Sequence, residues 1–198
     1  MILGRGELFF EFIKTIETIY STVITDGTIR DVNRAFQVAA TSVNVGEEVD
    51  LFSLHMNKEE IDSFSYDTRG FFSFVTMKYN IQWPLHLLFS PKILDHYNEL
   101  FRFLIRIKKI QYDLHKIWSF HRENKVHRSS ELLQFRNKLM FLIDNLQYYL
   151  QVDVLESQFS ILMDKIEDSK DFEHIQRAHT IFQANVLGLC FLLDNVST

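Results

Sequence analysis

The sequence predicts a mainly α fold, an elongated bundle of long helices with one small β-hairpin. Its 198 residues include only 6 glycines and 2 prolines, so the residues that favour tight turns are scarce. The 19 phenylalanines supply large apolar side chains for an aromatic-rich core. After Pro91, a helical pattern continues for roughly 30 residues, which corresponds to a helix on the order of 45 Å long.

Two helices are expected in residues 1–45. In residues 6–22, apolar side chains recur at helical spacing: Leu8, Phe9, Phe12, Ile13, Ile16, Ile19 and Tyr20. Asp26-Gly27 indicates a turn, and Thr28 can cap a second helix. One side of that second helix is apolar and carries Ile29, Val32, Phe36, Ala39, Ala40 and Val43. The first 45 residues are therefore predicted to form a helical pair.

A β-hairpin is expected within residues 50–84. In residues 71–83, apolar and polar side chains alternate, which is typical of a half-buried strand. The apolar side carries Phe71, Val75, Met77, Tyr79, Ile81 and Trp83. The partner strand is predicted at residues 51–56, and the polar stretch 57–70 is expected to be a mobile loop.

Residues 90–195 are predicted to form a bundle of long helices. Ser90-Pro91 begins the first of them, because serine is a good N-cap and proline fits the first helical position. This helix is expected to extend to about His121, with one apolar stripe made of Ile93, Tyr97, Leu100, Leu104, Ile107, Leu114 and Trp118. A second helix begins at Ser129 or Ser130 and continues to about Glu167.

The second long helix carries apolar stripes on two roughly opposite sides. One stripe contains Leu139, Ile143, Leu146, Leu150 and Val154. The other contains Phe141, Tyr148, Val152, Leu155, Phe159, Leu162 and Ile166. A helix that is apolar on two sides is expected to be packed between neighbours. A last helix, at about residues 172–193, is capped by Ser169 or Asp171. Together the three parts, 1–45, 50–84 and 90–195, are interpreted as a single partial domain, 1–198.

Composition argues against two classes of partner. The formal net charge of -5 gives no general attraction to nucleic acid. The apolar run 186–193 is too short to span a bilayer, and no signal-peptide pattern opens the chain, so we predict a cytoplasmic protein without membrane insertion. The one cysteine, Cys190, has apolar neighbours and is expected to be an inert core thiol.

No catalytic or cofactor-binding motif is recognisable, so the chain is not predicted to be an enzyme or to need a cofactor. It has no phosphate loop, no Gly-x-Ser-x-Gly elbow and no Cys-x-x-Cys pair. Asp171 and His174 form a single Asp-x-x-His pair, which we interpret as a helix cap, because a di-iron bundle needs two Glu-x-x-His motifs and two further carboxylates. His86 and His115 are expected to be core or boundary histidines.

Five residues are candidates for contact with a partner protein: Arg102, Arg106, Lys109, Asp153 and Glu156. The first three form a basic stripe on the first long helix together with Lys116. This stripe is either a solvated face or a docking surface for an acidic protein, whose encounter it would steer. Asp153 falls within an apolar stripe, where a carboxylate should be paired inside the fold or face a gap that a partner fills. Pairing inside the fold is the preferred interpretation.

Four segments resemble the gamma-tubulin complex component family. They read GRGELF at residues 4–9, DVNRAF at 31–36, QWPLH at 82–86 and DNLQYYLQVDVLESQFS at 144–160, and the last is the most specific. The resemblance implies the early and middle part of the C-terminal, gamma-tubulin-binding half of an elongated helical protein. It implies gamma-tubulin and other gamma-tubulin complex components as partners. It also implies a role in microtubule nucleation at microtubule-organising centres, such as the centrosome or spindle pole of the cytoskeleton.

The residues alone leave more than one class of function open. Long stiff helices and a basic stripe without catalytic groups fit a scaffold that holds subunits at a fixed spacing. The alternative is a helical adaptor or tether that binds some other protein partner. An all-helical enzyme is the least supported class, because no group of residues with catalytic spacing is recognisable.

Overall fold

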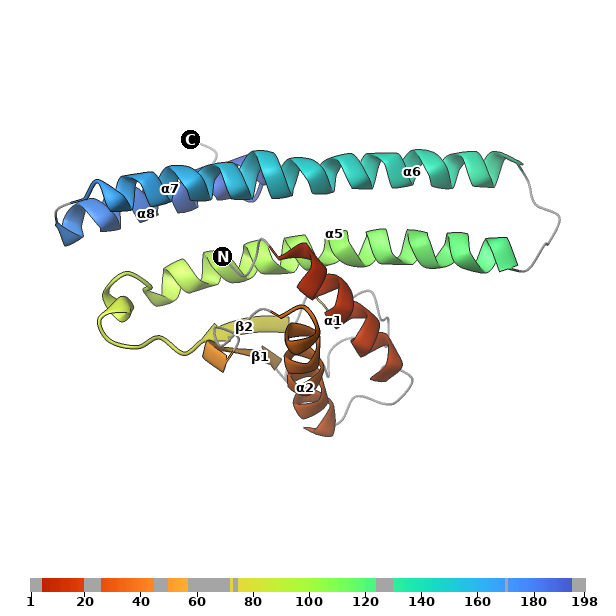
Figure 1. Ribbon diagram of the computed structural model, residues 1–198, viewed down its shortest axis with the longest axis horizontal. Helices are drawn as coiled ribbons and strands as arrows, with labels where there is room; N and C mark the ends of the chain where they lie inside the picture. The colour runs from red at the N-terminus through yellow and green to blue at the C-terminus, as the bar shows by residue number, and fades with distance from the viewer. Residues whose placement is uncertain are drawn as a thin grey trace.

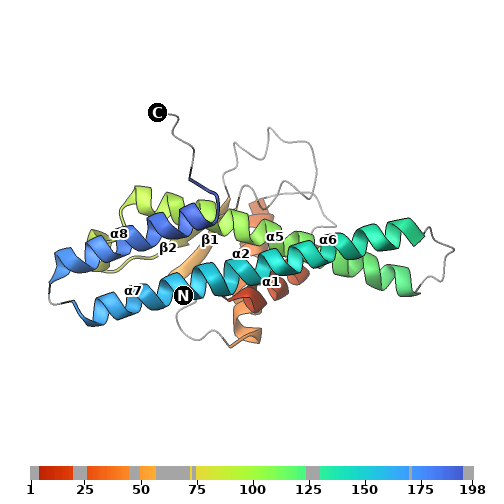
Figure 2. The same ribbon diagram turned by 90° about the horizontal axis from the view of Figure 1, so that it is seen from above.

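The computed structural model describes most of the chain, namely residues 5–19, 26–44, 50–56, 72, 75–123, 130–169 and 171–193. The predicted loop at 57–70 lies outside these residues. The described part is helical apart from one two-stranded antiparallel sheet, so the predicted mainly α fold with a small hairpin is confirmed. Figures 1 and 2 show an elongated molecule in which the long helices lie side by side and the smaller N-terminal elements pack against them.

The N-terminal part is the helical pair α1 (Gly6–Ile19) and α2 (Asp26–Ser42). The prediction that α2 begins after a turn at Asp26-Gly27 is wrong, since both residues belong to the helix. Backbone N–H groups in the first helical turn need no acceptor within the helix, so turn-forming residues are tolerated there. The Phe12 ring joins the two helices, because its centroid lies 5.6 Å from that of Phe36 and 6.5 Å from that of Phe72.

The hairpin consists of β1 (Phe52–Met56) and β2 (Val75–Tyr79), paired antiparallel with Phe52 opposite Tyr79. Two asparagine side chains fasten it. Asn33 of α2 bonds the Leu54 carbonyl at 2.6 Å and the Leu54 N–H at 2.7 Å, and Asn98 accepts from the Met77 N–H at 2.7 Å. These bonds satisfy backbone groups that a two-stranded sheet leaves unpaired at its edges.

The second strand is shorter than predicted. It ends at Tyr79, and Trp83, expected on the apolar side of the strand, is 81% exposed. The chain passes instead through η3 (Leu85–Leu87), a single 3₁₀ turn without buried residues. Alternation alone therefore overestimated this strand. The cross-strand bonds end with the Asn80 N–H, which donates to the Leu51 carbonyl at 2.7 Å, because residues 50 and 51 form a 3₁₀ turn before β1.

Four helical segments form the long part of the molecule. They are α5 (Pro91–Glu123), α6 (Ser130–Tyr148), α7 (Ser157–Glu167) and α8 (Phe172–Leu189), and the π-helical η4 (Tyr149–Glu156) joins α6 to α7. In Figure 1, α6, η4 and α7 form one continuous rod above α5, and α8 runs back beside α7. The long helix predicted to follow Ser90 is confirmed as α5, which at 33 residues is about 50 Å long.

Because of the π-helical segment η4, the two apolar stripes predicted for the rod do not lie on opposite sides of it. A π-helix bonds each residue to the one five further on, so it takes more residues per turn than an α-helix. The side chains that follow η4 are therefore rotated relative to those before it. Leu150, Val154 and Leu155 are all buried within η4, whereas Phe141 and Tyr148 are 72% and 63% exposed.

The prediction that this helix is packed on two opposite sides is consequently wrong. The partly buried stripe of α6 and the later stripe of α7 form one inward face, which meets α5 along α6 and α8 along α7. The same rotation explains Asp153. It was expected to lie within a buried stripe and to be paired there, but it is exposed, and no partner for it exists among the described residues.

Helix α8 begins as predicted at Asp171, whose carboxylate accepts the His174 N–H at 2.7 Å. Its end contains Cys190, confirmed as a core thiol: the side chain is 1% exposed, and burial raises its pKa to about 11. The expectation for His86 and His115 is wrong, since both are exposed. His86 lies in η3, which buries nothing, and His115 follows the last buried position of α5.

Among the residues that the structure describes, the buried histidine is His179 of α8, with 4% exposure. Its Nε2 lies 2.8 Å from the Tyr97 hydroxyl of α5, so the pair ties α8 to α5. Burial lowers the pKa of His179 and keeps the ring neutral at physiological pH. Buried residues of the helical pair, the hairpin and the long helices belong to one connected hydrophobic cluster. No helix of the described part is long and apolar enough to cross a bilayer.

Candidate partner-binding surface

The basic stripe of α5 contains Arg102, Arg106, Lys109 and Lys116, and the structure divides it into two parts. The two lysines face α1 and bind a carboxylate there. The two arginines lie nearer the N-terminal end of α5, and among the described residues neither forms an ion pair. Only the arginine part is therefore available to a partner without breaking a contact within the fold.

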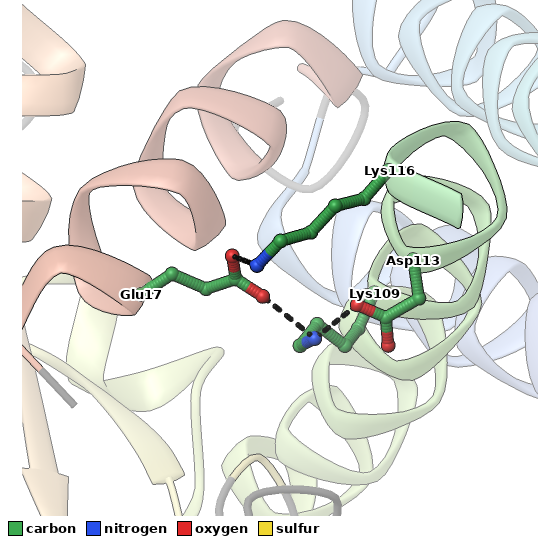
Figure 3. Close-up of polar contacts among 4 residues, drawn as sticks. All are labelled: Glu17, Lys109, Asp113 and Lys116. Atoms are coloured by element: carbon green, nitrogen blue, oxygen red, sulfur yellow. Dashed lines mark hydrogen bonds and ion pairs between the residues drawn. The ribbon is translucent and has the colours of Figure 1, made fainter. Parts of the chain in front are cut away.

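The lysines meet at Glu17, which reaches across from α1 (Figure 3). Lys109 Nζ lies 3.1 Å from Glu17 Oε1, and Lys116 Nζ lies 2.7 Å from Glu17 Oε2. Lys109 also pairs with Asp113 one turn along α5. The Lys109 side chain is 14% exposed and that of Glu17 is 22% exposed, whereas that of Lys116 is 62% exposed. The Lys109–Glu17 contact is therefore shielded from water, and the Lys116 contact is open to it. The cluster fastens α1 to α5.

The charges of this cluster shift the titration of its members. Burial alone would raise the pKa of Glu17, but hydrogen bonds from Lys116 and Lys109 outweigh it and leave the pKa below the ordinary value of 4.5. The hydrogen bond to Glu17 raises the pKa of Lys116. Because the folded pKa of Glu17 is lowered, its contribution to stability is present above pH 4.5 and is lost as the pH falls through the lower folded value.

We expect Glu17→Gln to lower the free energy of unfolding by about 1–2 kcal/mol at pH 7, because two charge-assisted hydrogen bonds are lost at a partly screened site. Urea unfolding monitored by circular dichroism measures this change. The difference from the parent chain should begin to shrink as the pH falls below 4.5 and should vanish below the lower pKa that Glu17 has in the folded chain.

The matched control is Glu173→Gln. Glu173 pairs with Arg177 within α8, and the two side chains are 72% and 71% exposed. Such an exposed pair contributes little, so this change should leave the unfolding curve unaltered. Equal effects of the two substitutions would contradict the fastening role of Glu17.

The arginine part of the stripe lies on neighbouring turns of α5. Arg106 is exposed, and its Nε donates to the Arg102 carbonyl at 3.1 Å. Arg102 is half-buried, and its guanidinium has no acid partner among the described residues. Two unpaired guanidinium groups at this spacing can bind carboxylates of an acidic surface.

The acidic candidates Asp153 and Glu156 lie elsewhere, in η4 of the rod, and both are exposed. The structure therefore does not bring the five predicted residues into one site. Arg102 and Arg106 form a basic pair on α5, and Asp153 and Glu156 form an acidic pair on η4. Lys109 is held by its ion pair with Glu17 of α1. Sequence reasoning missed Glu17, because it lies 92 and 99 residues from its lysine partners and no local pattern connects them.

An apolar cavity of about 360 Å³ lies between the hairpin, η3, α5, α7 and α8. Aromatic and aliphatic side chains line it, and His179 forms part of its wall. No group of three or more histidine, cysteine or acidic side chains that could hold a metal ion occurs in the described ranges. Tyr97 and His179 both line the cavity, and the hydrogen bond of 2.8 Å between them ties α5 to α8.

Comparison with known proteins decides the family. The family model described as "Gamma tubulin complex component C-terminal" matches residues 1–198. The chain belongs to the gamma-tubulin complex component family. Gamma-tubulin complex component 4 of Mus musculus is 38% identical over 214 residues, which cover 97% of this chain and 32% of the relative. The human protein of that name is 37% identical over 215 residues, with 97% and 32% covered.

A more distant relative is similar over the whole of this chain. Human gamma-tubulin complex component 3 is 26% identical over 216 residues, which cover 100% of this chain and 22% of the relative. The chain thus spans about a third of the length of the component 4 relatives, 32% in both cases. The family resemblance that the sequence segments indicated is confirmed by these matches.

Proposed function

We propose that this chain acts as a gamma-tubulin-binding scaffold within a gamma-tubulin complex and supports microtubule nucleation at microtubule-organising centres of the cytoskeleton. The observation that carries the proposal is the family match over residues 1–198. The long helices support it, because α5 and the rod of α6, η4 and α7 can hold a bound subunit at a fixed orientation. Preorganised subunits replace an improbable encounter in solution with a local one.

The proposed mechanism requires no bond to be made or broken by this chain. Its work is to position gamma-tubulin beside other complex components, and the nucleotide chemistry belongs to tubulin. We place one contact at Arg102 and Arg106, with Lys109 holding that part of α5 against α1. We place a second, acidic contact at Asp153 and Glu156. Both pairs are at least partly accessible in the fold.

The test is co-elution of the purified chain with purified gamma-tubulin in size-exclusion chromatography with light scattering, followed by titration at low and high salt. We expect a complex at micromolar concentration that weakens with salt, because exposed charges are screened within about 10 Å at 0.1 M. Arg102→Glu with Arg106→Glu should weaken binding by about tenfold or more, since it replaces attraction by repulsion at the interface.

The matched control is the same double charge reversal on α2, Arg30→Glu with Arg34→Glu, at two other exposed arginines. It changes the net charge equally and should leave the affinity unchanged. Equal weakening by both doubles would show a general charge effect and would remove the α5 contact from the proposal. Failure of the parent chain to form any complex would contradict the proposed function itself.

A further inference from the structure

The antiparallel helices α5 and α6 form a helical arm, and this arm carries an apolar face that no described element covers. We call it the arm face and define it by five side chains, each between 43% and 65% exposed: Ile110, Ile117, Leu132, Phe135 and Leu142. Figures 1 and 2 show that the C-terminal end of α5 and the N-terminal end of α6 extend beyond α7 and α8. Large exposed apolar side chains that gather on one face of a protein mark an interaction site.

The rows on the two helices have coiled-coil spacing. On α6, Leu132, Phe135, Leu139, Leu142 and Leu146 follow one another at steps of three and four. On α5, the same steps connect Ile107, Ile110, Leu114 and Ile117. Such rows form the seam along which helices supercoil. On α5, Ile107 and Leu114 are buried, and on α6, Leu139 and Leu146 are half-buried. The other members of both rows are exposed.

Both rows lie on the same side of the helical arm formed by α5 and α6. The opposite side is marked by a hydrogen bond of 2.7 Å from Gln111 of α5 to Asp144 of α6. On the α5 helical wheel, Ile110 and Gln111 lie on opposite flanks of the contact with α6, and on the α6 wheel, Leu142 and Asp144 do so. Because the Gln111–Asp144 bond marks one flank, Ile110 and Leu142 share the other.

Helix α8 is an example of a third helix that packs against the rod. It packs beside α7 as a third helix and stops at Leu189, whose carbonyl accepts a hydrogen bond of 3.1 Å from the Tyr149 hydroxyl. Tyr149 comes three residues after Leu146 and continues the α6 row. The α6 row from Leu146 back to Leu132 therefore lies beyond the end of α8, and no described helix covers it.

The charges around the arm face favour an acidic occupant. Arg106 lies one helical turn before Ile110 and borders the α5 row, and the exposed Lys138 lies one turn before Leu142 and borders the α6 row. Of the acids nearby, Asp113 is paired with Lys109, which leaves Glu131 at the start of α6. A second copy of this chain would bring like charges together, so the border disfavours self-association.

We propose that the arm face binds an amphipathic helix of another protein, one with an apolar stripe and acidic residues on both flanks. The helix lies along the two rows and completes a three-helix bundle. The α6 row from Leu132 to Leu146 spans about 21 Å, so four helical turns of the partner cover it. This inference goes beyond the proposed function, and its test contains no gamma-tubulin.

The probe is a fluorescent synthetic peptide of three heptads, with leucine at the apolar positions and glutamate at the flanking ones. A second peptide carries lysine at the flanks, and a third has the composition of the first in scrambled order. Fluorescence anisotropy with the purified chain should show the glutamate peptide binding at least about tenfold more tightly than either of the others.

Two substitutions one residue apart locate the site. Leu142→Glu places a charge in the arm face and should weaken binding of the glutamate peptide about tenfold or more. Phe141→Glu makes the same kind of change at a side chain that is 72% exposed on another side of α6, and it should leave binding unchanged. Phe135→Glu provides a second arm-face variant, and circular dichroism checks that each variant is folded.

Three results would overturn the proposal. One is equal binding of the glutamate and lysine peptides, which would remove the charge preference. Another is equal weakening by Phe141→Glu and Leu142→Glu, which would place the peptide elsewhere. The last is a dimer of the chain in light scattering that Leu142→Glu dissociates, because a second copy would then be the occupant.

Discussion

Replacing Phe12 by alanine is expected to lower the free energy of unfolding by about 3–5 kcal/mol, the usual cost of deleting a fully buried aromatic side chain. Phe12 is 0% exposed, and its ring packs edge-on against those of Phe36 and Phe72. The substitution removes the shared member of both aromatic pairs and leaves a cavity between α1 and α2. Since small domains are stable by only about 5–15 kcal/mol, this change should shift the urea midpoint strongly.

Phe141→Ala is the matched control, because it deletes the same side chain at a position that is 72% exposed. Its effect on the urea midpoint should be close to zero, since little apolar surface is returned to water. A loss of stability at Phe141 comparable to that at Phe12 would contradict the assignment of the core. An unchanged midpoint for Phe12→Ala would contradict the packing of α1 on α2.

The sequence predicted those parts of the fold that depend on local periodicity. The helical pattern after Ser90 became α5, and the alternation after residue 71 contains the strand β2. The Asp171 cap and the burial of Cys190 were also predictable, because each follows from neighbours within a few residues. Such local signals act before any tertiary contact is known.

Contacts between distant segments were not predictable in the same way. The commitment of Lys109 to Glu17 depends on how α1 crosses α5, and the sequence contains no pattern that fixes this crossing. The burial of His179 depends on the return of α8 against Tyr97. A lysine or histidine on a helix therefore has a predictable face but not a predictable partner.

The candidate site illustrates the same limit. On α5, Arg106 is exposed and Arg102 is half-buried, but the five candidates came from two helices whose relative rotation the sequence does not reveal. The arm face, in contrast, has a sequence signal: rows at steps of three and four on two consecutive helices. Periodicity reports an apolar row and does not report whether a neighbour covers it, so the sequence alone cannot identify this face as exposed.

Replacing Leu155 by alanine is expected to lower the free energy of unfolding by about 2–5 kcal/mol, because a leucine side chain that is fully buried is deleted. Leu155 is 1% exposed, and it owes this position to the π-helical η4. In an uninterrupted α-helix, Leu155 would lie roughly opposite Leu150, five residues earlier, and would turn away from the face that Leu150 buries. Urea unfolding of the variant thus tests the helical register of the rod as well as its packing.

The matched control is Leu142→Ala in α6, where the same deletion occurs at a side chain that is 60% exposed. It should leave stability almost unchanged, since the arm face is open to solvent in the isolated chain. If Leu155→Ala were as mild as Leu142→Ala, the rod would be an ordinary α-helix at this point. Asp153 would then return to the buried stripe, and its availability to a partner would be lost together with the rotation that η4 provides.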